Sequence, residues 1–163
     1  MSEELDIRYS YLTDAPYLQE WLLYPEVQRW FPVSGEKEVH DAVQNWIGCT
    51  RYGACLTGVI GKQPCAMGTL FLMPYRKVAH HCLFKLVVDP KYQKRGYGTS
   101  MLKNLKHLAK NYFRLEMMHA EVFEGNPFVY LLEKAQFVPF ARQEKFVKDG
   151  DQYLACILFE TVL

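Results

Sequence analysis

The sequence has no excess of charge of either sign and no long apolar run. Its 163 residues carry 19 Lys and Arg against 18 Asp and Glu, a formal net charge of +1. That balance gives no argument for a nucleic-acid partner. A membrane-spanning helix needs about 20 consecutive apolar residues, and no run approaches that length. We therefore expect neither a nucleic-acid nor a membrane partner.

Cysteine spacing typical of metal sites or disulfide frameworks is also missing. The five cysteines are scattered without a C-x-x-C pair, which fits small core residues in a reducing compartment. The N-terminus, M-S-E-E, is acidic and lacks the basic region and apolar run of a signal peptide. We expect a soluble, cytoplasmic protein that holds no metal.

Repeats, linkers and low-complexity tracts are absent, and the length suits one domain over residues 1–163. Half of the residues are hydrophobic and 15% are aromatic, enough to build a core. Hydrophobic periodicity predicts strands at 5–11, 52–60, 65–73, 79–88, 114–122, 137–148 and 152–161. It predicts helices at 14–22, 34–48, 98–113 and 127–135, and a short turn or helix at 25–31.

The order of these elements predicts an α+β fold with one mixed sheet and helices on its faces. Strands 79–88 and 114–122 are joined through a helix, so they should be parallel neighbours with a right-handed crossover. Short turns at 61–64 and 149–150 predict antiparallel hairpins.

The stretch from Val87 to Thr99, V-V-D-P-K-Y-Q-K-R-G-Y-G-T, carries the clearest functional signal. It contains the end of an apolar strand, a proline stop, a glycine turn and a helix start. Gly96 and Gly98 lack side chains, so their backbone N–H groups can approach a ligand closely. The following helix adds unpaired N–H groups and the positive end of its dipole. With the donors of Gln93–Arg95, the pattern indicates a pyrophosphate site.

Two other interpretations of the glycines stay open. The first is an ordinary turn that leads into a helix. The second is a dinucleotide fingerprint, which needs a third glycine where this chain has Met101, although Glu121 does follow about twenty residues later. No Walker pattern is present, since no G-K-S or G-K-T closes the loop.

The motif Gln93-Lys94-Arg95-Gly96-Tyr97-Gly98 resembles the acetyl-CoA loop of the GNAT superfamily of N-acetyltransferases. The preceding strand end at 86–90 is similar to the family's strand beside the pantetheine arm, and the segment 120–137 looks like its second signature. This resemblance covers residues 79–138. It implies the GNAT fold, with a mixed, mostly antiparallel sheet of about seven strands and helices on both faces, and acetyl-CoA as cosubstrate.

The resemblance also implies a set of cofactor contacts. A slot where strand 79–88 meets Pro90 would let a thioester arm pair with the backbone of Leu86 and Val88. The N–H of Val88 is the natural oxyanion donor, and Asn126 could bond the pantetheine amides or cap a helix. The expected cofactor-binding residues are Leu86, Val88, Gln93, Lys94, Arg95, Gly96, Tyr97, Gly98, Thr99 and Asn126.

The catalytic groups are less defined. Candidates for a general base on the two slot strands are Glu121, His119, His80 and His81. His80 and His81 are adjacent and point to opposite faces, and strand parity places His80 with Leu86 and Val88. Glu121 and His80 are therefore the base candidates.

The residue at the position of the family's general acid differs from the family pattern. Many GNAT enzymes place a tyrosine on the last helix, where this chain has Leu132 or, in another alignment, Glu133. Tyr130 is the nearby tyrosine, but it lies about 200° around the helix from Leu132. It stays a candidate beside an acid supplied by the amine itself.

The leading prediction is an N-acetyltransferase that moves the acetyl group of acetyl-CoA directly to a primary amine, on a protein N-terminus or a small molecule. The segment L-L-E-K at 131–134 is similar to the V-L-E-K of the RimJ/RimL group. One alternative is a catalytically weak CoA-binding sensor or scaffold of the same fold. The sequence leaves the oligomeric state open; one possible arrangement is a homodimer in which the final strand pairs across the dimer axis.

Overall fold

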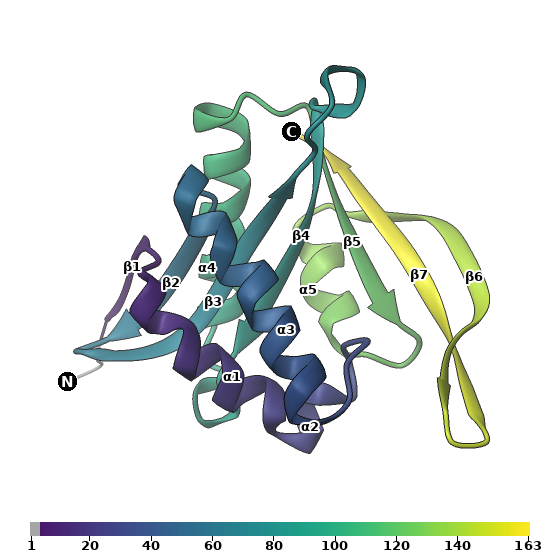
Figure 1. The fold of residues 1–163 in the computed structure, drawn as a ribbon. Coiled ribbons are helices and arrows are strands. Elements are labelled where there is room, and N and C mark those ends of the chain that lie inside the picture. The colour runs from purple at the N-terminus through teal and green to yellow at the C-terminus, as the bar shows by residue number, and fades with distance from the viewer. Residues whose placement is uncertain (1–3) are drawn as a thin grey trace.

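A computed structural model describes residues 4–163 and shows one seven-stranded sheet with helices on both faces (Figure 1). The strands are β1 Leu5–Tyr9, β2 Cys55–Ile60, β3 Gln63–Leu72, β4 His81–Val88, β5 Met117–Phe123, β6 Val138–Asp149 and β7 Gln152–Val162. Their order in the sheet is β1-β2-β3-β4-β5-β7-β6. Only β4 and β5 pair in parallel, so the predicted α+β fold with a mostly antiparallel sheet is confirmed.

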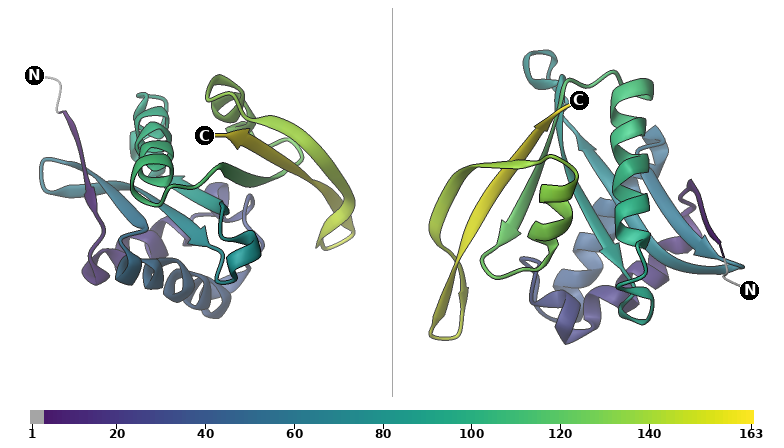
Figure 2. Two further views of the ribbon diagram at one scale, coloured as in Figure 1. Left: turned by 90° about the horizontal axis from the view of Figure 1, so that it is seen from above. Right: turned by 180° about the vertical axis from the view of Figure 1, so that it is seen from behind.

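The helices form two layers. They are α1 Ala15–Leu23, α2 Pro25–Gln28, α3 Gly35–Ile47, α4 Tyr97–His107 and α5 Phe128–Lys134. Figure 2 shows α1 to α3 on one face of the sheet and α4 with α5 on the other. A π-helical turn, Leu108–Tyr112, continues α4. No helix within residues 4–163 combines the length and apolar character needed to cross a membrane.

Strand alternation divides the core into the same two layers. Phe84 and Leu86 of β4 belong to the cluster that includes Met101 of α4. Val87, the neighbour of Leu86, belongs to the other cluster with Trp21 of α1. Successive strand residues point to opposite faces, so β4 contributes to both cores at once.

The parallel pair of β4 and β5 is short. It has three register partners, and the last is Leu83 with His119. The sequence placed the separation of the two strands at Pro90, and that position was wrong. The strands separate directly after Leu83, which leaves most of β4 without a neighbour on that edge.

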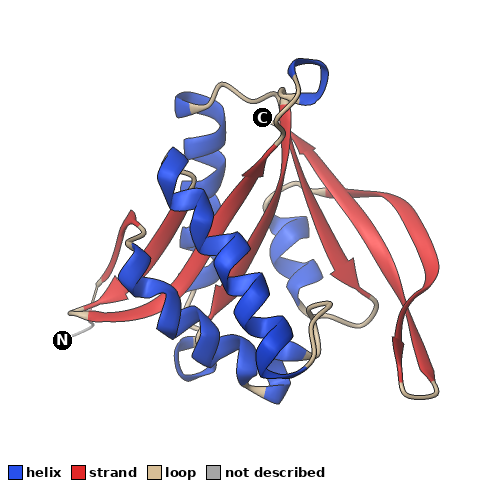
Figure 3. Cartoon of the chain, viewed as in Figure 1, coloured by secondary structure: helices blue, strands red, loops and turns tan. Residues whose placement is uncertain are grey.

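The C-terminal hairpin corrects another expectation. The final strand, β7, has β5 on one side and β6 on the other, so it has no free edge to offer a second molecule. The free edge belongs to β6, whose residues are almost all exposed. Figure 3 shows this hairpin projecting beyond the helices.

Candidate active site

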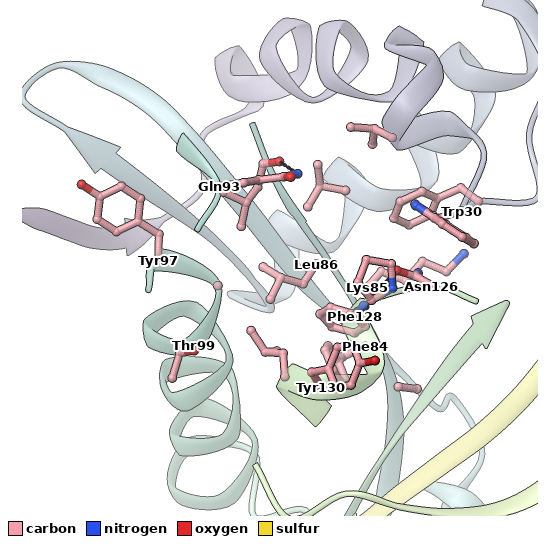
Figure 4. Close-up of a pocket in the computed structure, with 18 of the residues that line it drawn as sticks. Trp30, Phe84, Lys85, Leu86, Gln93, Tyr97, Thr99, Asn126, Phe128 and Tyr130 are labelled. Carbon is pink, nitrogen blue, oxygen red and sulfur yellow. Dashed lines mark hydrogen bonds between the residues drawn. The ribbon is translucent and has the colours of Figure 1, made fainter. Parts of the chain in front are cut away.

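A cavity of about 630 Å³ opens where β4 and β5 separate. Its walls come from β4, β5, the glycine loop, the start of α4, α5 and the segment around α2 (Figure 4). The backbone N–H and C=O groups of β4 that point toward β5 after Leu83 have no strand partner. Backbone groups need hydrogen-bond partners when they are covered, so this edge can pair with an extended ligand.

The glycine loop ends in an exposed set of helix N–H groups. Gly96 has φ +84° and precedes the first residue of α4, a conformation that glycine adopts without steric cost. The first bond into the helix runs from Ser100 N–H to the Gly96 carbonyl, at 3.1 Å. The N–H groups of Tyr97, Gly98 and Thr99 therefore have no acceptor inside the helix, which makes an anion site.

Gly98 is required for a different reason from Gly96. A Cβ at Gly98 would lie 3.0 Å from Leu131 Cδ1 and 3.7 Å from Val88 Cγ2. At Gly96 no atom lies within 4 Å of that position. Gly98 thus allows α4 to pack closely on α5 and β4, whereas Gly96 makes the turn and leaves space for a ligand.

Hydrogen bonds fix the loop to the end of β4. Gln93 Nε2 donates to the Val88 carbonyl at 3.1 Å. The buried Asp89 accepts from the N–H of Lys91 at 3.0 Å, and its own N–H donates to the Cys65 carbonyl at 2.8 Å. The Gln93 side chain therefore holds the loop in place in addition to lining the cavity.

The structure brings most of the predicted site residues together. Those that line the cavity are Leu86, Val88, Gln93, Lys94, Gly96, Tyr97, Gly98, Thr99, Glu121, Asn126 and Tyr130. Arg95 does not, and its guanidinium carbon lies 5.5 Å from the centre of the Tyr92 ring. His80 is also outside the cavity lining, because it lies in the turn before β4 and not on the strand, where the sequence had placed it.

The histidines form a separate group at the other end of the strands. The His81 and His119 rings lie 4.8 Å apart, and His119 Nε2 is 3.7 Å from Glu160. Burial, His119 and His80 lower the pKa of His81. Among residues 4–163, no group of three His, Cys, Asp or Glu side chains is placed to hold a metal ion.

Asn126 has the helix-cap role that the sequence left open. Its Oδ1 accepts from the N–H of Phe128 at 3.0 Å, at the start of α5. Asn126 is also one of the residues that line the cavity.

Comparison with known proteins identifies this arrangement. The sequence profile of the acetyltransferase (GNAT) family matches residues 20–132, which include the cavity's loop and both of its strands. The chain belongs to the GNAT acetyltransferase family.

Solved structures share the GNAT fold across nearly the whole chain. One, provisionally identified as a phosphinothricin N-acetyltransferase, is 14% identical, has a TM-score of 0.86, and covers 98% of this chain and 99% of its own. The yncA protein of Salmonella typhimurium, solved with its cofactor acetyl-CoA, is 14% identical and has a TM-score of 0.83. The match covers 98% of this chain and 94% of the yncA chain. The ribosomal-protein-alanine N-acetyltransferase of Brucella melitensis is 17% identical and has a TM-score of 0.78. The match covers 97% of this chain and 99% of the Brucella chain. No curated protein matches the chain by sequence.

In this GNAT protein Leu132, one of the two positions at which the family resemblance placed a tyrosine, is part of the core. Leu132 is 0% exposed and packs in the cluster beneath α4 and α5. Tyr130 is 67% exposed and lies at the rim of the cavity. A hydroxyl at position 132 would point away from the cavity, so Tyr130 is the tyrosine of α5 that can reach it.

The cavity has a second compartment, on the α1–α3 face, that the sequence did not identify. Its lining includes Trp30 and Phe31 near α2, Lys85 on β4, and Glu121 and Phe123 on β5. The only signal for Lys85 was a charge within the apolar strand C-L-F-K-L-V-V. This compartment is continuous with the part of the cavity that borders the glycine loop.

Proposed function

We propose that this chain binds acetyl-CoA in the cavity between β4 and β5 and transfers its acetyl group directly to a primary amine. The observation that supports this most strongly is the coincidence of two features. The edge of β4 is unpaired after Leu83, and it leads straight to the left-handed turn at Gly96 and the free N–H groups of α4.

The residues present fit the cofactor in three places. The N–H groups of Tyr97 to Thr99, with Lys94 nearby, suit a pyrophosphate. The edge of β4 from Phe84 to Val88 suits the amides of a pantetheine arm. Asn126 faces the same space from the start of α5. That yncA, of the same fold, was solved with acetyl-CoA supports the assignment.

The reaction forms one bond between the amine nitrogen and the acetyl carbon and breaks the carbon–sulfur bond. Glu121 takes a proton from the acceptor ammonium, directly or through water, which frees the nitrogen lone pair. The N–H of Val88 stabilises the negative charge that develops on the carbonyl oxygen. The second amine proton goes to the leaving thiolate, through Tyr130 or directly. His80 lies outside the cavity and has no part in this scheme.

Two classes of acceptor fit this proposal, a protein N-terminus and a small-molecule amine. Relatives of the same fold carry names of both kinds, a ribosomal-protein-alanine N-acetyltransferase and a provisional phosphinothricin N-acetyltransferase. Both are primary amines, so the reaction chemistry is the same.

The direct test is release of CoA from acetyl-CoA in the presence of a panel of primary amines. Turnover with any amine above the rate of hydrolysis would support the enzyme. Tight binding of acetyl-CoA without turnover on any amine would favour the alternative, a CoA-binding sensor or scaffold.

A further inference from the structure

Lys85 is a half-buried lysine without an ionic partner. Its Nζ lies 5.6 Å from the centre of the Phe71 ring, so its stem follows the apolar layer under α3. Among residues 4–163, no carboxylate lies within 4.0 Å of Nζ. Burial lowers the pKa of Lys85, and the negative charge of Glu121 only partly opposes this shift. An anion in the cavity would supply the partner that this ammonium lacks.

Glu121 stands opposite Lys85 across the gap. Leu83 and His119 are the last register partners of β4 and β5, and Lys85 and Glu121 are the residues two positions further along each strand. They point to the same face, and both line the cavity. Because the strands have already separated, one wall carries a positive charge and the other a negative charge, with space between them.

Aromatic residues close this space toward α2. Trp30 and Phe31 line it from the segment after α2, and Phe123 lines it from β5. Figure 4 shows Lys85 and Trp30 on the same side of the pocket. The compartment thus offers a cation, an anion and an apolar wall within one small volume.

We propose that the acceptor is a small amine that also carries a carboxylate, an α-amino acid or close analogue. Its carboxylate binds Lys85, its amine faces Glu121, and its side chain lies against Trp30 and Phe31. This inference rests on the proposed acetyltransferase function. A peptide N-terminus has an amide in place of that carboxylate and would leave Lys85 without its partner, so we assign the site to the free amino acid.

The experiment compares matched acceptors with acetyl-CoA and follows CoA release. Each of several L-amino acids with apolar side chains is assayed beside its carboxamide and beside a short peptide with the same first residue. The carboxamide keeps the amine and side chain but loses the negative charge. Its amine is also the less basic of the two, which favours the carboxamide in any site that ignores the carboxylate.

The free acids should have kcat/KM values at least about tenfold above those of their carboxamides, the usual effect of one hydrogen-bonded charge. The Lys85→Met variant should reduce this ratio to about one, whatever it does to the absolute rates. Lys85→Arg should keep most of the preference. The control, Lys62→Met in the exposed turn between β2 and β3, should keep all of it.

Results that contradict the amino-acid assignment can be distinguished from results that contradict the proposed acetyltransferase function. Carboxamides or peptides acetylated as well as the free acids would overturn the amino-acid assignment while leaving the acetyltransferase intact. A preference that survives Lys85→Met would do the same. No turnover of any acceptor, with acetyl-CoA bound, would overturn the proposed function and this inference together.

Discussion

Gly96 and Gly98 are two residues apart, yet they satisfy different physical requirements. Gly96 needs a positive φ and borders open space, whereas Gly98 is helical and limited by Leu131. The glycine pattern alone assigned both to close approach of a ligand. In the structure Gly96 borders open space and Gly98 packs against Leu131, so ligand approach stays a prediction for Gly96 and helix packing is added for Gly98.

Replacing Gly96 by valine should weaken acetyl-CoA binding strongly and leave the fold intact. The side chain would enter the space in front of the α4 N–H groups and strain a backbone with φ +84°. The strain should cost about 1–2 kcal/mol of stability, and acetyl-CoA affinity should fall by about a hundredfold, as expected when charge-assisted hydrogen bonds are lost. Calorimetry with acetyl-CoA measures the affinity.

Gly61→Val is the matched control for Gly96→Val. Gly61 also has a positive φ, +62°, with no atom within 4 Å of a Cβ, but it lies in the turn between β2 and β3. It should lose similar stability and keep its acetyl-CoA affinity. Equal acetyl-CoA affinity in the two variants would show that the glycine loop does not bind the cofactor.

Replacing Glu121 by glutamine should lower turnover far more than cofactor affinity. Glutamine keeps the size of the side chain but cannot accept the amine proton, and a positioned base contributes about a hundredfold or more. Glu116→Gln, at the exposed start of the same chain segment and outside the cavity lining, should leave turnover unchanged. Steady-state kinetics measures both variants. Equal turnover rates would show that Glu121 is not the general base.

At the scale of elements, the sequence predicted the seven strands and the longer helices to within a few residues, from hydrophobic periods and turn residues. It left 25–31 as a short turn or helix and did not predict the single 3-10 turns. It also predicted the parallel pair of β4 and β5, since a helical crossover joins them. It did not predict where these strands separate, because that depends on the tertiary packing around both strands and not on the hydrophobic period of either one. Lys85 was missed for the same reason, since a single charge in an apolar strand has no meaning until the opposite wall is known.

A buried charge network connects β1, α1 and β2. Asp14 is 3% exposed and accepts from both guanidinium nitrogens of Arg8, at 2.8 and 3.0 Å. It also accepts from the N–H of Tyr11 at 2.8 Å and the hydroxyl of Thr57 at 2.9 Å. Burial alone would raise the pKa of Asp14, but these bonds outweigh it and lower the pKa. The ionised carboxylate therefore stabilises this corner of the fold.

Asp14→Asn should destabilise the protein by about 2–3 kcal/mol, since it leaves Arg8 and two neutral donors without a charged acceptor. Asp6→Asn, at an exposed position on β1, should cost much less. Denaturant unfolding of both variants measures the difference. Equal stability would show that the network contributes little.

The same carboxylate predicts a pH dependence. A lowered folded-state pKa gives stability that is fully present above the unfolded value, about 3.9 for aspartate. That contribution is lost as the pH falls through this value toward the folded pKa. Between about pH 6 and about pH 3, a range that includes the unfolded pKa of about 3.9, the wild type should therefore lose more free energy of unfolding than the Asp14→Asn variant. Parallel curves of unfolding free energy against pH would contradict this role of Asp14.

At the scale of the whole molecule, the projecting hairpin of β6 and β7 determines which strand edge is free for self-association. Because β7 is internal, a homodimer would have to use another surface, such as the free edge of β6. The homodimer and the cytoplasmic location stay predictions. Light scattering tests the oligomeric state, which the sequence leaves open: twice the chain mass of 19.1 kDa would support a homodimer, and a mass of one chain would contradict it.

The central claim is that the gap between β4 and β5 binds acetyl-CoA. The most direct measurement is the thermal stability of the protein with acetyl-CoA, CoA or NADH at equal concentration. A ligand at about a hundred times its dissociation constant adds roughly 2.7 kcal/mol of stability. We predict a clear rise in Tm with both CoA species and none with NADH. No rise with either CoA species would contradict the account.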